Sequence, residues 1–405
     1  MTDINVKSEI NPLKKVLLHR PGEELLYLTP NTLDELLFDD IPDLELAQRE
    51  HDYFASILTS CGAEVVYLED LMADVLSDSD IKEQFIDQFL KESGQTNPEI
   101  LFIAKEYLQS IKDNKLLVLK TMAGVSLLDI DRFDKDSLHL MDNRINYLAL
   151  NPMPNLYFTR DAFASIGENV SINAMYSKTR NRETIYGDYI FKYHPDYKDV
   201  VDLYGRDNDY HIEGGDILNV TMDSLLIGIS QRTEFEAIKK LAENLFLSDI
   251  KTDISNIYAL EIPNNRAFMH LDTVFTMIDK DAFTYHPGIM KNLKIYQFTK
   301  NDKGIKIKEI DQMLDIFLAE VLKVDKVRLF ACGNGDPIAA EREQWSDGSN
   351  TLAIAPGEIV VYKRNRVTNN ALKEAGFKLH ELDVSNLSVG RGGPRCMSMP
   401  LVRES

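Results

Sequence analysis

A recurring order of strand, helix and strand constrains the fold of this chain more than any other sequence feature. The order occurs three times: in KVLLHRPG, ELAQREHDYFASILTS and AEVVYL; in LLIGISQRT, FEAIKKLAENL and IYALEI; and in IVVYKRNRVT, NNALKEAG and FKLHEL. The β-branched runs are typical of buried strands, and Gly62 and Gly376 are placed to end their helices. Such units arranged around an axis would form a propeller-like α/β domain, although one doubly wound sheet also fits the pattern.

A helical stretch interrupts this pattern between residues 71 and 148. DVLSDSDIKEQFIDQFLKES and EILFIAKEYLQSIKD have apolar positions at three- and four-residue spacing, as amphipathic helices do. Two prolines in NPMPN, at 151–155, argue against the helices continuing. We therefore predict a helical insertion at 71–148 within an α/β catalytic domain made of residues 1–70 and 149–405.

Composition narrows the classes of partner. The chain has 65 acidic and 45 basic residues, a formal net charge of −20, so phosphate backbones and anionic membranes would repel it. No apolar run approaches the roughly 18 residues of a transmembrane helix, and MTDINVKSEI lacks the pattern of a signal peptide. Three widely spaced cysteines suit a reducing compartment, so we predict a soluble cytoplasmic protein without nucleic-acid or membrane partners.

Cofactor motifs are absent from the sequence. CxxC, HExxH, GxGxxG and the GxxxxGK phosphate loop do not occur. We therefore expect no metal and no cofactor, so that any chemistry must come from side chains.

Cys396 is the candidate nucleophile. It lies in SVGRGGPRCMSMPL, where glycines predict an irregular loop whose backbone can approach a ligand closely. Arg391 and Arg395 flank it and should favour the thiolate over the thiol, whose ordinary pKa is about 8.5. Cys61 and Cys332 have no such surroundings, and we expect both to be small buried residues.

His270 and its neighbour Asp272 lie in AFMHLDTVFTMID. Read as a strand, this segment places both side chains on one face, as a general acid/base or a cation site requires. A second candidate is HIEGGD, in which two glycines follow Glu213 and precede Asp216. Taken alone, the first motif also fits a polar pair at a strand edge, and the second fits an ordinary turn.

Asp161 lies in the strand-like, aromatic run NLYFTRDAFASIG, where it forms either a surface ion pair or a buried carboxylate that requires a cation. Several carboxylates around one thiol would hinder peptide hydrolysis. They would favour a guanidinium, which is planar, stays positively charged up to a pKa of about 12, and binds carboxylates in bidentate fashion.

The motifs together resemble the arginine deiminase family of the pentein superfamily. The matching stretches, in the family's order, are NPMPNLYFTRDAFASIG, YSKTRNRET, HIEGGD, GISQRTE, MHLDT and GRGGPRCMSMPL, with LKKVLLHRPGEELLYLTPNTLDELLFDD at the start. The resemblance implies a five-bladed α/β-propeller with a helical insertion. It also implies hydrolysis of free L-arginine to citrulline and ammonia, the first step of arginine catabolism by deimination.

The resemblance also implies roles for individual residues. Cys396 would form a covalent S-alkylthiouronium intermediate, and His270 would protonate the departing ammonia and then activate water. The other catalytic positions are Asp161 and Asp272, which would grip guanidinium nitrogens, and Glu213, which would hold His270 or a substrate nitrogen. The substrate-binding positions are Arg180 and Arg232, for the α-carboxylate, Asn155 and Phe158, in the pocket, and Arg391, in a loop that closes over it.

Other functions stay open at this point. Related reactions are transfer of the amidino group to an amine and hydrolysis of methylated arginine or agmatine. A non-catalytic module that binds a partner and a cysteine peptidase are alternatives from other classes, and a homo-oligomer is compatible with the sequence.

Overall fold

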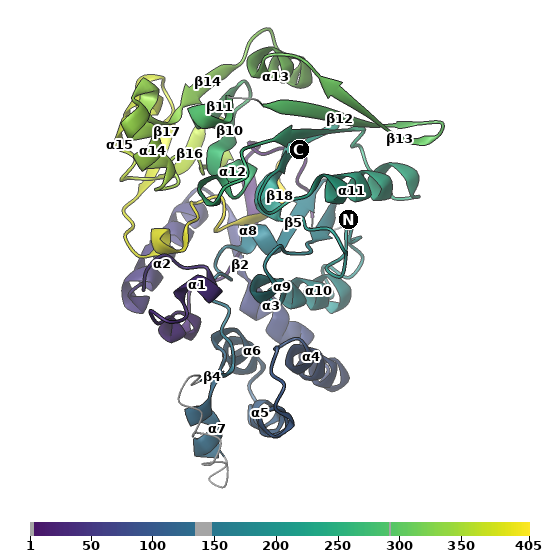
Figure 1. The fold of residues 1–405 in the computed structure, drawn as a ribbon, viewed down its shortest axis with the longest axis vertical. Coiled ribbons are helices and arrows are strands. Elements are labelled where there is room, and N and C mark those ends of the chain that lie inside the picture. Colours follow the sequence, from purple (N-terminus) through teal and green to yellow (C-terminus); the bar gives the residue numbers. More distant parts are fainter. Residues whose placement is uncertain (1–3, 134–147, 291–292) are drawn as a thin grey trace.

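The computed structural model describes residues 4–133, 148–290 and 293–405 of the chain. Residues 134–147, which belong to the predicted insertion, lie outside the described residues. Helices and small sheets alternate along the chain, which makes the fold a mixed α/β fold (Figure 1).

Four groups of three strands share one topology, in which the first strand is antiparallel to the second and the second is parallel to the third. In the order first, second, third, the groups are β18 (Met399–Arg403), β1 (Leu13–Leu18) and β2 (Glu64–Tyr67); β7 (Ile217–Thr221), β8 (Ser224–Ile229) and β9 (Asn256–Glu261); β10 (Phe275–Asp279), β11 (Ala282–Tyr285) and β14 (Arg328–Ala331); and β15 (Leu352–Ala355), β16 (Glu358–Tyr362) and β17 (Lys378–Leu382).

A fifth group has the same order with a shorter third member. β5 (Phe163–Ile166) pairs antiparallel with β6 (Asn169–Ile172), and Val170 of β6 forms a single parallel bridge with Asp202. One group is also extended, because the hairpin of β12 (Lys294–Asn301) and β13 (Gly304–Ile310) adds to the edge of β9.

Helices connect the second and third strands of the groups: α2 (Leu44–Ser60), α10 (Thr184–Tyr193), α11 (Phe235–Leu247), α13 (Leu314–Leu322) and α15 (Arg366–Glu374). In α11, Ile238, Leu241 and Leu245 recur at helical spacing and pack in one apolar cluster with Leu225 and Ile227 of β8. Burial of this face stabilises the helix on its sheet, since an isolated helix of this length is marginal in water.

The three predicted strand–helix–strand units are confirmed as β1–α2–β2, β8–α11–β9 and β16–α15–β17, each with parallel strands. Gly62 and Gly376 follow the ends of α2 and α15 with φ of +88° and +91°, so both act as the predicted helix stops. The alternative of one doubly wound sheet is wrong, because the strands belong to separate small sheets.

Helices also occupy the described part of 71–148, at the lower end of Figure 1. They are α3 (Leu68–Val75), α4 (Ser79–Lys91), α5 (Pro98–Ser110), α6 (Asn114–Ala123) and α7 (Leu127–Phe133), with a two-stranded sheet of β3 (Val125–Ser126) and β4 (Leu148–Leu150). Asp78, Asn97 and Asp113 accept backbone hydrogen bonds at the starts of α4, α5 and α6. The division of the chain into domains at residues 71 and 148 stays a prediction.

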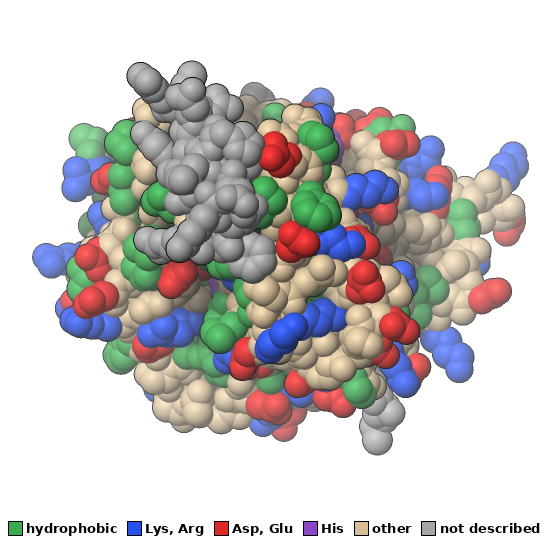
Figure 2. Space-filling view, turned by 90° about the horizontal axis from the view of Figure 1, so that it is seen from below, with side chains coloured by type: hydrophobic (Ala, Val, Ile, Leu, Met, Phe, Trp, Pro, Cys, Tyr) green, Lys and Arg blue, Asp and Glu red, His purple; other side chains and the backbone are tan. Residues whose placement is uncertain are grey.

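The remaining elements are short: η1 (Glu23–Tyr27), α1 (Leu33–Leu36), α8 (Thr159–Ala162), α9 (Lys178–Asn181), η3 (Gly214–Asp216), η4 (Arg266–Phe268), α12 (Leu271–Val274), η5 (Pro287–Met290), η6 (Cys332–Gly335), α14 (Pro337–Gln344) and η7 (Leu387–Gly390). Among the described residues, no helix combines the length and apolar character needed to cross a membrane. Figure 2 shows acidic and basic side chains interspersed on the face seen from below.

Candidate active site

The candidate site is built from segments that directly precede the first strand of each group. Asp161 is in α8 before β5, Glu213 precedes η3 and β7, and His270 precedes α12 and β10. Residues 347–350 precede β15, and the glycine-rich run that ends at Cys396 precedes β18. The site therefore depends on all five groups, although its residues lie far apart in the sequence.

The strand assignments at His270 and Asp161 were wrong. His270 has extended backbone but is followed by the helical turn α12, and the strand begins only at Phe275. Asp161 lies in the helical turn α8, and its strand begins at Phe163. Alternating residue types over so few positions cannot separate a strand from a single helical turn that leads into one.

Cys396 is 2% exposed, and its Sγ atom lies among polar groups. The thiol is 3.7 Å from Oδ2 of Asp272, and Asn350 donates a hydrogen bond from Nδ2 to Sγ at 3.1 Å. The Oδ1 atom of Asn350 accepts hydrogen bonds from the backbone N–H groups of Arg395 and Cys396, at 3.1 and 3.2 Å. One side chain thus holds both the loop and the sulfur.

The glycines before Cys396 are needed for close packing. A Cβ atom on Gly393 would lie 2.6 Å from the carbonyl oxygen of Asn350, and one on Gly392 would clash with the ring of Phe158. The glycines let this backbone approach neighbouring protein groups closely, and its predicted approach to a ligand stays a prediction.

Arg395 lowers the pKa of Cys396, which is the predicted direction, but other groups outweigh it in the ligand-free protein. Burial and the nearby carboxylates of Asp272 and Asp161 hold the pKa of Cys396 well above its usual range. The guanidinium of Arg395 also pairs with Asp272 at 2.8 Å and with Glu9 at 3.0 Å. An additional positive charge near the sulfur would therefore be required to form the thiolate.

His270 is held as an imidazolium by carboxylates. Its Nε2 atom is 2.6 Å from Oε2 of Glu213, and its Nδ1 atom is 3.8 Å from Oδ1 of Asp161. Burial alone would lower the pKa of His270, but Asp161 and Glu213 raise it to about 9. The group can therefore donate a proton near neutral pH.

The glycines of HIEGGD bring this segment against His270. A Cβ atom on Gly215 would lie 2.7 Å from Nδ1 of His270, so only glycine fits there. Asp216 accepts hydrogen bonds from the N–H of Leu271 and from Ser230, both at 2.7 Å, and so fixes the start of α12.

The other predicted residues surround one small cavity. Eight of the ten predicted positions line it: Asn155, Phe158, Asp161, Arg180, Arg232, His270, Arg391 and Cys396. The remaining two, Glu213 and Asp272, contact His270 and the Cys396 sulfur instead. The structure thus brings all ten predicted residues together.

Arginine side chains occupy much of this cavity. Arg180 pairs with Asp161 at 2.8 Å and with Glu183 at 2.9 Å, while Arg391 stacks on Trp345 and pairs with Asp39 at 3.5 Å. The cavity has a volume of about 30 Å³, room for roughly two water molecules. A ligand of amino-acid size therefore requires these side chains to move.

A metal is one occupant that the carboxylates could hold. Ligand atoms of Asp161, Glu213 and His270 lie within 4.8 Å of one another. However, Asp161 pairs with Arg180 at 2.8 Å, and Glu213 pairs with Arg232 at 3.8 Å. These two cations would repel a metal ion at this position. The donor set suits a cationic organic group better than a metal.

Sequence reasoning missed Asn350, and it did not anticipate the ion pairs of Arg395 with Glu9 and Asp272. Asn350 is in the unremarkable stretch SDGSNTLAIA, and its residue type alone carries no signal. Its position in the chain could have identified it. The segment directly precedes β15, just as each of the other site segments precedes the first strand of its group.

The repeated strand groups, together with a buried thiol, imidazole and carboxylates at one small cavity, define a class of mixed α/β proteins. Solved structures share the fold. The N-terminal domain of ArgZ, an arginine dihydrolase from cyanobacteria, aligns with a TM-score of 0.54 and 15% identity, covering 96% of this chain and 97% of that one. SxtG, an amidinotransferase from Microseira wollei, aligns with a TM-score of 0.55 and 14% identity, over 100% and 98%. These are pentein-fold enzymes.

Sequence comparison is more specific. The family model for arginine deiminase matches residues 34–403. Arginine deiminase of Treponema denticola is 53% identical over 410 residues, covering 100% of this chain and 99% of the relative. That of Streptococcus sanguinis is 53% identical over 404 residues, covering 99% and 98%. The chain belongs to the arginine deiminase family.

Proposed function

We propose that this protein is a hydrolase that converts L-arginine to citrulline and ammonia through a covalent intermediate on Cys396. Full-length identity to named arginine deiminases supports the activity. The proposed mechanism rests mainly on the position of the Cys396 thiol. It lies 3.7 Å from Asp272, in a cavity that His270 and Asp161 also line.

Substrate binding starts the reaction. Asp161 and Asp272 hold the guanidinium nitrogens, and the planar group is thereby oriented with its carbon facing Sγ. The Oδ1 atom of Asp161 has no hydrogen-bond partner among the described residues, which leaves it free for such a nitrogen. The positive charge of the substrate lowers the pKa of Cys396, and the thiol releases its proton.

Arg180 and Arg232 hold the α-carboxylate of the substrate, with Asn155 and Phe158 completing the pocket. Arg180 must then exchange its present partner Asp161 for the carboxylate, and that exchange also frees the acid for the guanidinium. Arg391 moves with its loop to admit the substrate and close over it.

The covalent steps follow from the charges of the site. The sulfur bonds to the guanidinium carbon, His270 gives its proton to the departing nitrogen, and ammonia leaves behind an S-alkylthiouronium. The neutral imidazole then takes a proton from water, and the resulting hydroxide adds to the same carbon. Cleavage of the C–S bond, with loss of the added hydroxyl proton to solvent, releases citrulline and restores the thiolate. Glu213 keeps the imidazole oriented throughout.

The architecture belongs to the same proposal. We infer that the five strand groups are the blades of a propeller, that residues 71–148 form a helical insertion, and that residues 1–70 and 149–405 form the catalytic domain. The protein acts in the cytoplasm on a small molecule, as a monomer or a homo-oligomer, and binds neither nucleic acid nor membrane. The reaction itself uses no metal and no cofactor.

Replacement of the nucleophile tests the activity. Cys396→Ala should lower kcat by at least about 10⁴-fold while arginine still binds, because the covalent route is lost. The assay measures ammonia and citrulline from arginine alone, and Cys61→Ser, which removes an exposed thiol outside the cavity, serves as the control. Near-normal turnover by Cys396→Ala would refute the nucleophile, and a strict need for an amine acceptor would show a transferase.

The intermediate can be trapped directly. Arginine labelled in its guanidino carbon should remain on the protein after an acid quench, and peptide mapping should find the label at Cys396. Label that is absent or attached elsewhere contradicts the covalent mechanism.

A further inference from the structure

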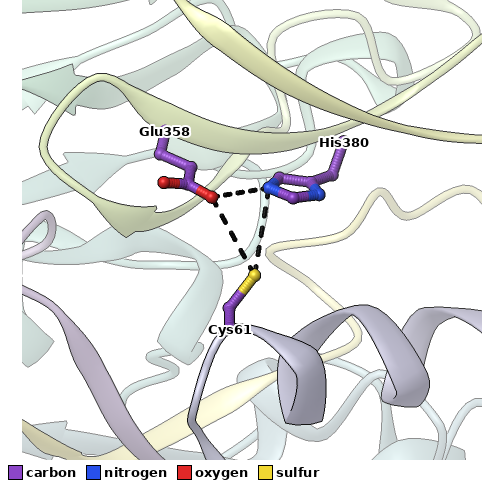
Figure 3. A group of neighbouring side chains, drawn as sticks. All are labelled: Cys61, Glu358 and His380. Carbon is purple, nitrogen blue, oxygen red and sulfur yellow. Dashed lines mark hydrogen bonds and ion pairs between the residues drawn. The ribbon is translucent and has the colours of Figure 1, made fainter.

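A second cluster of reactive side chains lies outside the cavity. It consists of Cys61, Glu358 and His380, whose side chains point toward one another in Figure 3. Cys61 follows the end of α2, Glu358 begins β16, and His380 is in β17. None of the three lines the cavity at Cys396.

The burial expected for Cys61 was wrong, since this cysteine is exposed. It directly follows the last residue of α2, where helical periodicity no longer fixes the face on which a side chain lies. Its thiol is instead directed at residues that are 297 and 319 positions away in sequence. By contrast, Cys332 is buried, as expected.

The geometry of the cluster is close to that of a metal site. The sulfur is 3.9 Å from Oε1 of Glu358 and 3.9 Å from Nε2 of His380, and these last two atoms are 2.7 Å apart. Bonds of about 2.0–2.3 Å at tetrahedral angles place the ligand atoms of zinc roughly 3.3–3.6 Å apart. Side-chain shifts of a few tenths of an ångström would therefore suffice.

We propose that Cys61, Glu358 and His380 bind one Zn²⁺ ion, with water as the fourth ligand. A thiolate, an imidazole and a carboxylate are the three protein donors that zinc accepts, and the thiolate disfavours the hard cations Mg²⁺ and Ca²⁺. Solvent reaches the cluster, because the side chains of Glu358 and His380 are 24% and 21% exposed. An ion has an entry path and room for water.

One neighbouring cation must give way. Lys378 pairs with Oε1 of Glu358 at 2.7 Å, but its side chain is 67% exposed and flexible, so it can turn to solvent or to the second carboxylate oxygen. The ion would also replace the hydrogen bond between Glu358 and His380. Lys378 therefore weakens the site without blocking it.

Zinc at this position would connect two strand groups. α2 belongs to the group of β1 and β2, whereas Glu358 and His380 belong to that of β16 and β17. An ion that binds only the folded arrangement stabilises it by mass action. The site thus has a structural role, independent of turnover at Cys396.

The test uses full-length protein with Cys396→Ala, so that Cys61 is the accessible thiol. Calorimetric titration with ZnCl₂ should give one equivalent, and Co²⁺ should produce a thiolate-to-metal charge-transfer band. Cys61→Ser should abolish the band and weaken zinc binding by more than the roughly 10- to 100-fold that loss of an outer-shell partner costs. His380→Gln and Glu358→Gln should each weaken binding as well.

Two controls complete the design. Glu381 is in β17, next to His380, and its carboxylate pairs with Lys373. Glu381→Gln should therefore leave zinc binding unaffected. Lys378→Ala removes the competing cation and should tighten binding. The proposal is overturned if no zinc binds at micromolar concentrations, or if binding survives Cys61→Ser, because the metal would then be elsewhere, for example at Asp161, Glu213 and His270.

Discussion

Asn350 should control the reactivity of Cys396. Its Nδ2 atom donates to the sulfur at 3.1 Å, while the neighbouring carboxylate of Asp272, 3.7 Å away, can only accept from the thiol. When the proton leaves, the contact with Asp272 becomes repulsive until a guanidinium neutralises it. The amide of Asn350, which already donates to the sulfur, then stabilises the thiolate by this hydrogen bond.

The size of the effect follows from this single bond. A hydrogen bond to a charged group contributes about 1.5–3 kcal/mol, which corresponds to roughly 1–2 pKa units and a 10- to 150-fold change in rate. Asn350→Ala should therefore raise the pKa of Cys396 further and lower kcat by about that factor. KM should change less, because Asn350 does not line the cavity.

The assay follows alkylation of the thiol by iodoacetamide across a pH series. Modification is read at the Cys396 peptide by mass spectrometry, because the exposed Cys61 also reacts. Asn369→Ala is the matched control. This buried amide donates to the backbone carbonyl of Tyr362 at 3.0 Å, as Asn350 does to that of Asp272 at 3.1 Å, but it lies outside the site.

The control separates chemistry from folding. Asn369→Ala should lower stability without slowing alkylation or turnover, whereas Asn350→Ala should slow both. If Asn350→Ala remains folded and keeps the alkylation profile and kcat of the unmodified protein, the assigned role is refuted.

Two further outcomes concern pH. Asp161 and Glu213 together raise the pKa of His270 to about 9. Glu213→Gln should therefore move the alkaline limb of kcat/KM, where the proton donor is lost, to lower pH; an unchanged limb would contradict the acid role of His270. Burial lowers the pKa of His51 to about 3, and its ring nitrogens have no hydrogen-bond partner among the described residues. Between about pH 6.5 and 3, the unfolded chain therefore binds a proton at His51 that the folded chain excludes. In that window the free energy of unfolding decreases by roughly 1.4 kcal/mol for each unit by which the pH is lowered. His51→Leu should remove this loss, so its free energy of unfolding relative to the unmodified protein should rise from pH 7 to pH 5 in denaturant titrations; a constant difference would contradict the assignment.

The sequence was informative where local pattern determines structure. Three strand–helix–strand units and two helix-ending glycines could be predicted because hydrophobic periodicity and positive φ are properties of short segments. The glycines beside Glu213 and before Cys396 do mark places where the backbone packs closely, but the groups that they meet, His270, Phe158 and Asn350, come from distant parts of the chain.

Side-chain direction was the part that the sequence could not provide. Arg395 was expected to face the thiol beside it, but its guanidinium is bound by Glu9, 386 positions away, and by Asp272. Cys61 was expected in the core and instead meets residues from β16 and β17. In irregular segments, the partners that decide orientation come from distant parts of the chain, and no local periodicity records them.

Topology supplies a rule that residue types do not. Asp161, Glu213, His270, Asn350 and Cys396 supply four different functional groups, yet each lies within a few residues before the first strand of its group. Because the groups share one strand order, the starts of their first strands meet around one cavity, as the contacts of Cys396 with Asn350 and of His270 with Glu213 require. Each group can then change the residue that it contributes without disturbing the pairing of its strands. The same rule would have selected residues 347–350 as a site segment before any side chain was considered, so in a chain with this strand order the functional residues are found by position first and by chemistry second.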